Sequence, residues 1–210
     1  MRSIELIQFS CEDHEKIDII MKEMQKLRIN DNIKDTLIFV EHPEIVTIGP
    51  KAKKENILPP EDYPRKFVDR GGGLTWHGPG QLVIYPIFKW DLKDEKNIEK
   101  IINKLEEWVI NTFSDLGING KRDQRMRGVW VNDKKIAALG VRISRWVTMH
   151  GFSLNINPDL KYYQGIIPCG ISQYGVTSMA NILGNSSPKM SEIKEKIVSQ
   201  FISNFSAYKN

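Results

Sequence analysis

Apolar residues recur at the spacing of an amphipathic helix in three stretches of the chain, near 12–27, 97–116 and 188–208. The repeating positions are Ile17, Ile20, Met21, Met24 and Leu27, then Ile98, Ile101, Ile102, Leu105, Trp108 and Val109, and finally Ile193, Ile197, Phe201 and Phe205. The signals that start or stop these stretches are Ser10 with Asp13, which resembles a capping box, Gly117, and Ser187 before Pro188. The pattern predicts three helices.

Short runs rich in β-branched and aromatic residues lie between these stretches and predict strands. They cover 37–40, 45–48, 81–88, 129–131, 135–143 and 152–156. Asn132 and Asp133 separate two of the runs and predict a hairpin turn. Because strands follow strands and helices come in blocks, the order favours an α+β fold over a doubly wound one.

The composition is typical of a globular chain with its own core. The residues are 40% hydrophobic and 27% charged. A length of 210 residues predicts a single domain over residues 1–210, with two small domains as the alternative. No apolar run reaches the roughly 18 residues of a membrane span, and the N-terminus turns acidic too early for a signal peptide. We therefore expect no association with a membrane.

Cysteine and histidine are few and lie far apart along the sequence. The two cysteines, Cys11 and Cys169, argue against a disulfide scaffold and favour reduced thiols and a cytoplasmic location. The histidines are His14, His42, His77 and His150. Their separation, and the lack of clustered cysteines, predict no metal site.

The net charge of +4 is mild, and we expect no nucleic-acid partner. The basic residues nevertheless fall into three groups. These are Lys51, Lys53 and Lys54; Arg65, Lys66 and Arg70; and Lys121, Arg122, Arg125 and Arg127. Each group alone is typical of solvated loops, whereas together they would suit an acidic protein partner.

A glycine-rich segment, Arg70–Ile87 (RGGGLTWHGPGQLVIYPI), is the first of three candidates for chemistry. Six of its first eleven residues are Gly or Pro. Glycine lets backbone approach a ligand closely, and the lack of Gly-Lys-Ser/Thr excludes a Walker phosphate loop. The segment indicates either a binding loop or a long irregular turn, in which His77 could bond locally or assist chemistry.

The other two candidates carry a lysine and a cysteine. Lys135 begins the run KIAALG, where it could mark the solvent end of a strand or point into an apolar pocket, which would lower its pKa. Cys169 lies between Pro168 and Gly170, where a turn could present a reactive thiol, although buried inert cysteines are also common. The residue types alone leave both alternatives open.

In this order, the motifs RGG-x-x-T-W-HGPGQL, KIAALGVRISRWVTMHGFSLNINPDL and IIPCGI resemble the octanoyl-carrier-protein:protein octanoyltransferases of lipoate biosynthesis. The resemblance runs from about Glu41 to Thr177. It implies the fold of the biotin and lipoate protein ligases, with a mixed, largely antiparallel sheet and packed helices. It also implies an acyltransferase that needs no cofactor.

The resemblance places the acylated cysteine at Cys169 and the catalytic lysine at Lys135. It places the acyl-binding residues at Arg70, Gly71, Gly72, Gly73, Leu74, Thr75, Trp76, His77, Ala138, Leu139, Gly140, Gly151, Phe152 and Ser153. In the implied ping-pong reaction, Lys135 takes the thiol proton or pairs with the thiolate, and later returns a proton to the leaving sulfur. Backbone N–H groups near Leu139, Gly140 and Cys169 would form an oxyanion hole.

The implied donor is octanoyl-acyl carrier protein. The implied acceptors are the lipoyl domains of 2-oxoacid dehydrogenase E2 subunits and the glycine cleavage H protein, and donor and acceptors alike are expected to be acidic. Two alternatives remain. An ATP-dependent lipoate or biotin ligase would share the fold without needing Cys169, and a non-catalytic binding module would tolerate loss of both Cys169 and Lys135.

Overall fold

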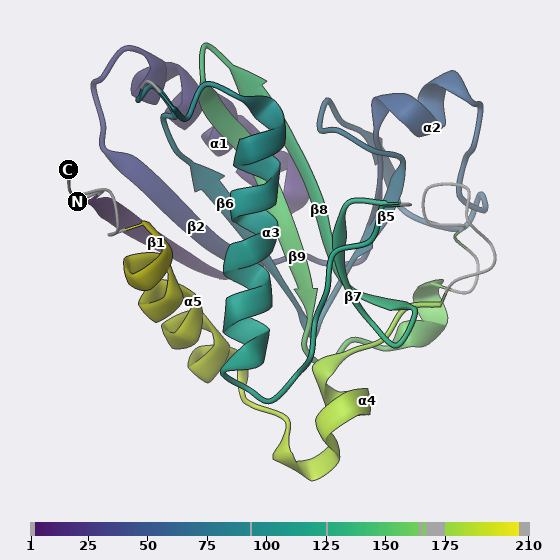
Figure 1. Ribbon diagram of the computed structural model, residues 1–210. Coiled ribbons are helices and arrows are strands. Elements are labelled where there is room, and N and C mark those ends of the chain that lie inside the picture. The colour runs from purple at the N-terminus through teal and green to yellow at the C-terminus, as the bar shows by residue number, and fades with distance from the viewer. Residues whose placement is uncertain (1–2, 93, 125, 164–165, 167–174, 206–210) are drawn as a thin grey trace.

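A six-stranded sheet forms the centre of the molecule (Figure 1). The computed structural model describes residues 3–92, 94–124, 126–163, 166 and 175–205. In spatial order the strands are β1 (Ile4–Cys11), β2 (Asp35–Glu41), β6 (Gln81–Ile87), β9 (Val147–Asn155), β8 (Lys134–Ser144) and β7 (Gly128–Val131). The β1–β2 pair is parallel and the other neighbouring pairs are antiparallel. This is the mixed, largely antiparallel sheet that the family resemblance implied, whereas the residue pattern alone predicted only an α+β fold.

A second, smaller sheet has the order β4 (Arg65–Phe67), β3 (Ile45–Ile48) and β5 (Leu74–His77). Strand β5 corrects the prediction of a loop or irregular turn in the part of the glycine-rich segment that precedes the predicted strand at 81–88. Its residues Leu74 and Trp76 are buried against Val46 and Ile48 of β3, and this packing holds the segment extended. His77 is therefore the last residue of a strand and not part of a loop.

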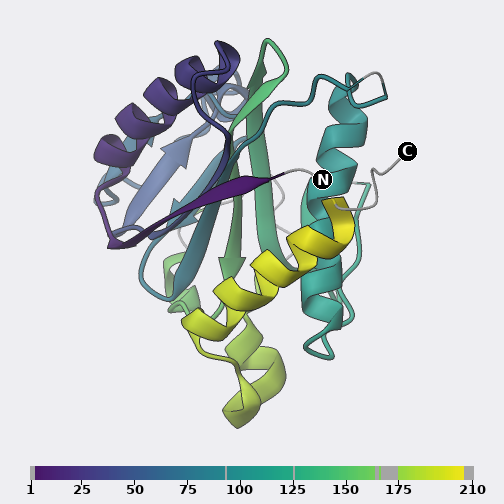
Figure 2. The ribbon, with the colours of Figure 1, turned by 90° about the vertical axis from the view of Figure 1, so that its left-hand side faces the viewer.

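Helices cover both faces of the central sheet (Figure 2). They are α1 (His14–Ile29), α2 (Pro50–Lys54), α3 (Ile98–Ser114), α4 (Met179–Leu183) and α5 (Met190–Phe205), with 3₁₀ turns at Leu160–Tyr163 and Gly184–Ser186. Figure 2 shows α1 on one side of the sheet and α3 and α5 on the other. No helix in the described part of the chain is both long and apolar enough to cross a bilayer.

Each face of the sheet has its own apolar core. Ile17 and Met21 of α1 pack against Val83 of β6 and Met149 of β9 on one face. On the other face, an aromatic cluster joins α3, α5 and the sheet, with the ring of Trp108 5.4 Å from that of Phe152 and 5.5 Å from that of Phe201. The indole N–H of Trp108 also donates to the Ile197 carbonyl, 2.8 Å away, which fixes α5 on α3.

The three long helices agree with the predicted stretches, but the start of the first one differs. Asp13 is the N-cap of α1, and its carboxylate accepts a hydrogen bond from the Glu15 N–H at 2.7 Å. The capping box predicted at Ser10 is wrong because Ser10 belongs to β1, a strand that the sequence reading missed.

The predicted hairpin turn at Asn132 and Asp133 is confirmed. Val131 pairs with Lys134, and both turn residues have positive φ, at 46° and 61°. This is the geometry of a two-residue type I′ turn. The turn fixes the register that carries Lys135 into β8.

Candidate active site

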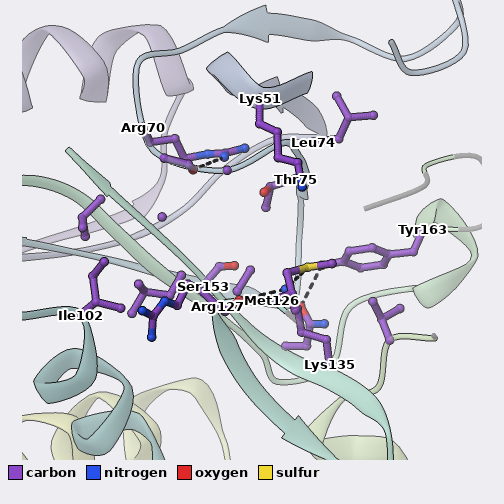
Figure 3. A pocket seen from close by; sticks show the side chains of 18 residues that line it. Lys51, Arg70, Leu74, Thr75, Ile102, Met126, Arg127, Lys135, Ser153 and Tyr163 are labelled. Atoms are coloured by element: carbon purple, nitrogen blue, oxygen red, sulfur yellow. Dashed lines mark hydrogen bonds between the residues drawn. The ribbon is translucent and has the colours of Figure 1, made fainter. Parts of the chain in front are cut away.

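A pocket of about 290 Å³ opens between the small sheet and strands β8 and β9 (Figure 3). Lys51, Arg70, Gly71, Gly72, Leu74 and Thr75 line one wall, and Ile102, Met126, Arg127, Lys135, Ala138, Leu139, Gly140, Val141, Ser153, Asn155, Tyr163 and Val176 line the rest. Figure 3 shows Lys135, Met126 and Tyr163 gathered at one end, across from Thr75, Leu74 and Lys51. The lining is mainly apolar, with few charged groups, as in small-molecule sites.

Arg70 braces the glycine-rich wall from inside. Its guanidinium is buried and donates to the Gly71 and Gly73 carbonyls at 2.9 and 3.1 Å. It also donates to the carbonyl and the hydroxyl oxygen of Thr47, at 3.0 and 2.8 Å. These bonds satisfy carbonyls of an irregular turn that would otherwise be buried without partners. Arg70 is therefore part of the wall that shapes the pocket.

The same wall lies unusually close to β8. The Gly71 N–H donates to the Val141 carbonyl at 3.1 Å. A Cβ added at Gly140 would stand 2.7 Å from the Gly71 carbonyl oxygen. Gly140 is therefore required by the close approach of two backbones, and this approach closes one side of the pocket.

Lys135 is the second residue of β8, and its side chain is 8% exposed. Its ammonium donates to the Arg127 carbonyl at 3.0 Å and to the Met126 sulfur at 2.6 Å. It also lies 5.0 Å from the centroid of the Trp130 ring. Of the two alternatives for Lys135, the structure shows the buried one, with the ammonium at the edge of an apolar pocket.

The third candidate, Cys169, lies outside the described residues. The described chain on either side of it borders the pocket, since both Tyr163 and Val176 line it. The chain after the cysteine is joined to the lysine, because the Lys135 N–H donates to the Gly175 carbonyl at 3.0 Å and the Thr177 N–H donates to the Lys135 carbonyl at 2.9 Å. The described residues that flank the IIPCGI segment therefore lie at the pocket, at Tyr163 before it and at Val176 after it, and Gly175 and Thr177 are bonded to Lys135.

His77 makes the local hydrogen bonds that the sequence allowed for it. Gln81 directs its amide N–H groups to Asn155 Oδ1 at 2.9 Å and to the Tyr163 hydroxyl at 2.7 Å, so its Oε1 accepts from His77 Nδ1 at 2.7 Å. Burial, reinforced by neighbouring His42 and His14, holds the pKa of His77 well below its usual value. A neutral His77 and Gln81 thereby fix Asn155 and Tyr163, two residues of the pocket wall.

Three histidines that are far apart in the sequence meet in space, which corrects the prediction that they are scattered. The ring centroid of His14 lies 5.1 Å from that of His42 and 6.2 Å from that of His77, and the His42–His77 separation is 5.9 Å. Within the ranges that the structure describes, no three histidine, cysteine or carboxylate side chains are placed to share a metal ion.

The structure brings together most of the predicted acyl-binding residues. Arg70, Gly71, Gly72, Leu74, Thr75, Ala138, Leu139, Gly140 and Ser153 line the pocket, and His77, Gly151 and Phe152 line a smaller cavity beside it. Gly73 and Trp76 line neither, because the Gly73 carbonyl faces Arg70 and Trp76 is in the small-sheet core. The lining residues that sequence reasoning missed are Lys51, Ile102, Met126, Arg127, Val141, Asn155, Tyr163 and Val176.

Known proteins resemble the chain over nearly its whole length. Residues 19–202 match the family model of the lipoyl protein ligase A/B catalytic domain. The chain is 39% identical to an octanoyltransferase of Caldicellulosiruptor bescii, over 90% of this chain and 86% of that one. It is 41% identical to an octanoyltransferase of Rubrobacter xylanophilus, over 87% and 84%.

The fold is also similar to that of a solved structure, a bi-partite lipoate protein ligase and its E2 lipoyl domain from Thermoplasma acidophilum. The TM-score is 0.72 at 15% identity, and the match covers 98% of this chain and 85% of that one. At this identity the likeness shows the fold alone, and it confirms the predicted biotin and lipoate ligase architecture.

Proposed function

Because the chain belongs to the lipoyl protein ligase A/B catalytic family and is an acyltransferase of its octanoyltransferase branch, we propose that residues 1–210 form one catalytic domain that transfers an octanoyl group through a thioester on Cys169. The donor is octanoyl-acyl carrier protein. The acceptor is a lysine of the lipoyl domains of 2-oxoacid dehydrogenase E2 subunits and of the glycine cleavage H protein.

The observation that carries this proposal is the buried Lys135 ammonium at the edge of an apolar pocket. Chain that follows Cys169 in the sequence is hydrogen-bonded to Lys135 through Gly175 and Thr177. A cation beside a thiol stabilises the thiolate, which is the nucleophile. A pocket of about 290 Å³ with mainly apolar walls suits a medium-length acyl chain.

The reaction proceeds in two exchanges at the acyl carbon. The Cys169 thiol passes its proton to the neutral amine of Lys135, which gives a thiolate paired with the Lys135 ammonium. The thiolate sulfur bonds to the acyl carbon, the bond to the carrier sulfur breaks, and the ammonium gives the proton to that leaving sulfur. An acceptor lysine amine then attacks the new thioester, and the amide forms as the Cys169 sulfur leaves and regains a proton. The first exchange is near neutral in free energy and the second is strongly downhill, so no nucleotide is required.

The oxyanion that forms in each exchange needs hydrogen-bond donors from the wall of the pocket. Leu139 and Gly140 line the pocket in β8, and their backbone N–H groups together with that of Cys169 are our candidates. An ATP-dependent ligase on this fold would activate the acid with a nucleotide instead, and would have no use for a thioester on Cys169.

The decisive experiment looks for the acyl-enzyme in the absence of acceptor and ATP. Mixed with octanoyl-acyl carrier protein alone, the protein should gain one octanoyl group by intact mass. The adduct should be labile to hydroxylamine, map to Cys169, be absent in Cys169→Ala, and discharge when a lipoyl domain is added. Lys135→Ala should form the same adduct on the order of a hundredfold more slowly, since general acid–base catalysis contributes ~10²–10⁴ in rate.

Two results would contradict the proposal. An unchanged mass alongside octanoylated acceptor would mean that the acyl group passes directly between the two partners. Activity that appears only with ATP would indicate a ligase. Thermal melting of Cys169→Ala and Lys135→Ala should match that of the unmodified protein, so that lost chemistry is separated from lost folding.

A further inference from the structure

A second, much smaller cavity of about 30 Å³ adjoins the main pocket. The two cavities share Arg70, Thr75, Ala138, Leu139, Gly140 and Ser153 as lining residues. The small cavity lies deeper, against α1, because His14 and Tyr85 line it but not the main pocket. It is therefore placed at the inner end of the proposed acyl site.

The inner end is polar although its surroundings are apolar. His14, His77, Tyr85 and His150 line the cavity, and all four are buried. Three of these four side chains already have a hydrogen-bond partner. His77 is bonded to Gln81, His150 Nε2 lies 2.8 Å from the Asp69 carboxylate, and the Tyr85 hydroxyl lies 2.9 Å from His42. An acyl chain that reached this end of the site would contact these polar side chains instead of apolar ones.

The bond directions leave an acceptor at Tyr85, and a buried ring nitrogen of His14 is left without a partner in the described part of the chain. His42 Nδ1 lies 2.7 Å from the Glu12 carbonyl, which can only accept, so His42 Nε2 is unprotonated and Tyr85 donates its hydroxyl proton to it. The Tyr85 oxygen can then accept a further hydrogen bond. His14 Nδ1 is buried without a hydrogen-bond partner in the described part of the chain.

Buried polar atoms of this kind are commonly satisfied by an internal water with two or more partners. A volume of about 30 Å³ admits one. Burial lowers the pKa of His14 to about 3, so its ring is neutral at physiological pH.

We propose that this cavity holds one ordered water, which is hydrogen-bonded to His14 Nδ1 and donates to the Tyr85 oxygen. We propose further that this water is the end stop that limits acyl chain length. The inference rests on the proposed function. Chains up to about eight carbons fill the pocket and leave the water in place. A longer chain must displace this water and leave two buried polar atoms without hydrogen-bond partners, a loss that the added methylenes only partly offset.

The test is a competition among acyl-thioester donors of six to fourteen carbons, with acyl-enzyme adducts resolved by mass. His14→Leu removes the buried acceptor, and we expect the ten-carbon to eight-carbon adduct ratio to rise about tenfold. His14→Asn is the matched control: its side-chain oxygen replaces Nδ1, and the ratio should stay near that of the unmodified protein. Tyr85→Phe removes the other acceptor and should raise the ratio in the same direction.

The possible results separate the inference from the proposed function. A protein that accepts octanoyl but keeps the same chain-length ratio in both His14→Leu and Tyr85→Phe would overturn the end stop alone. A ratio that rises equally in His14→Leu and His14→Asn would mean that ring size, and not the buried acceptor, sets the limit, and would also overturn it. An unmodified protein that accepts no acyl chain would overturn both. If His14→Leu does not fold, Tyr85→Phe decides the question.

Discussion

Burying a neutral histidine makes the folded state sensitive to acid. His14 has a pKa of about 3 in the folded protein, chiefly because burial penalises the charged ring, against a usual value near 6.5. Between these values the unfolded chain binds a proton that the folded chain does not. The free energy of unfolding therefore falls as pH drops below about 6.5, and it stops falling only near pH 3.

We predict that this effect can be measured through one side chain. His14 alone should remove about 1.4 kcal/mol of stability per pH unit once the pH is below 6.5, or roughly 2 kcal/mol by pH 5. Urea unfolding at pH 7.5 and pH 5 should thus show a smaller loss of stability in His14→Asn than in the unmodified protein. An equal loss in both would mean that His14 is protonated in the folded state.

The role of a single residue could be predicted where the residue belongs to a sequence motif. It could not be predicted where residues far apart in the sequence meet only in the folded protein. Lys135 and the glycines of the wall stood in motifs long enough to be specific, and Lys135 is buried at the pocket edge. Tyr163 and Asn155 are joined to Gln81 by hydrogen bonds across 82 and 74 residues of chain. No local pattern indicates contacts of that range.

At the scale of helices and strands, the spacing of apolar residues identified the elements in which buried positions recur at a regular interval. The long helices and the Asn132–Asp133 hairpin follow directly from apolar spacing and turn chemistry. Strand β5 was missed because only four residues, Leu74–His77, are extended between two glycine-rich turns. Strand β1 was missed because most of its residues are exposed or half-buried, so it lacks the apolar run of an inner strand.

The β6–β9 pair depends on the absence of a side chain at one position. A Cβ on Gly151 would stand 2.0 Å from the Ile84 carbonyl oxygen and 2.7 Å from Pro86, and both belong to β6. We predict that Gly151→Ala lowers the free energy of unfolding by about 3 kcal/mol, because backbone in the middle of a sheet cannot yield. Chemical denaturation would measure it.

Gly71→Ala is the control for that substitution. Its Cβ would meet the Val141 carbonyl oxygen at 3.4 Å, an ordinary contact, and stability should change by less than about 1 kcal/mol. If the two variants are equally stable, the central sheet accommodates a methyl group that its geometry indicates it cannot.

At the scale of the whole molecule, the three groups of basic residues differ in their burial and in whether a carboxylate lies near them. Arg70 is buried as an internal brace, and Lys66 lies 3.6 Å from Asp18. Arg122 and Arg127 face the buried carboxylate of Glu106 at 3.4 and 3.7 Å. The remaining group, Lys51, Lys53 and Lys54, is exposed on and around α2, and no carboxylate of the described residues lies within ion-pair distance of it.

This group stands beside the pocket, since Lys51 lines its mouth, and it suits an acidic carrier protein. Lys53→Glu with Lys54→Glu leaves the pocket lining intact. We predict that this double variant lowers kcat/KM for octanoyl-acyl carrier protein about tenfold at low salt. In the unmodified protein kcat/KM should fall as salt rises from about 0.05 to about 0.3 M, because screening of exposed charges is already strong at ~0.1 M. In the double variant this fall should be smaller. A short octanoyl thioester without the protein should be used about equally well by both forms.

The matched control places the same charge change elsewhere. Lys194→Glu with Lys196→Glu alters α5, which lies on the far side of the molecule from α2 in Figure 1. If long-range net charge governed the encounter, this variant would lose as much kcat/KM as the α2 variant. If the lysines of α2 form the docking surface, it should lose little, and the salt dependence of the unmodified protein should persist. Equal effects of the two variants would assign steering to the net charge and not to α2.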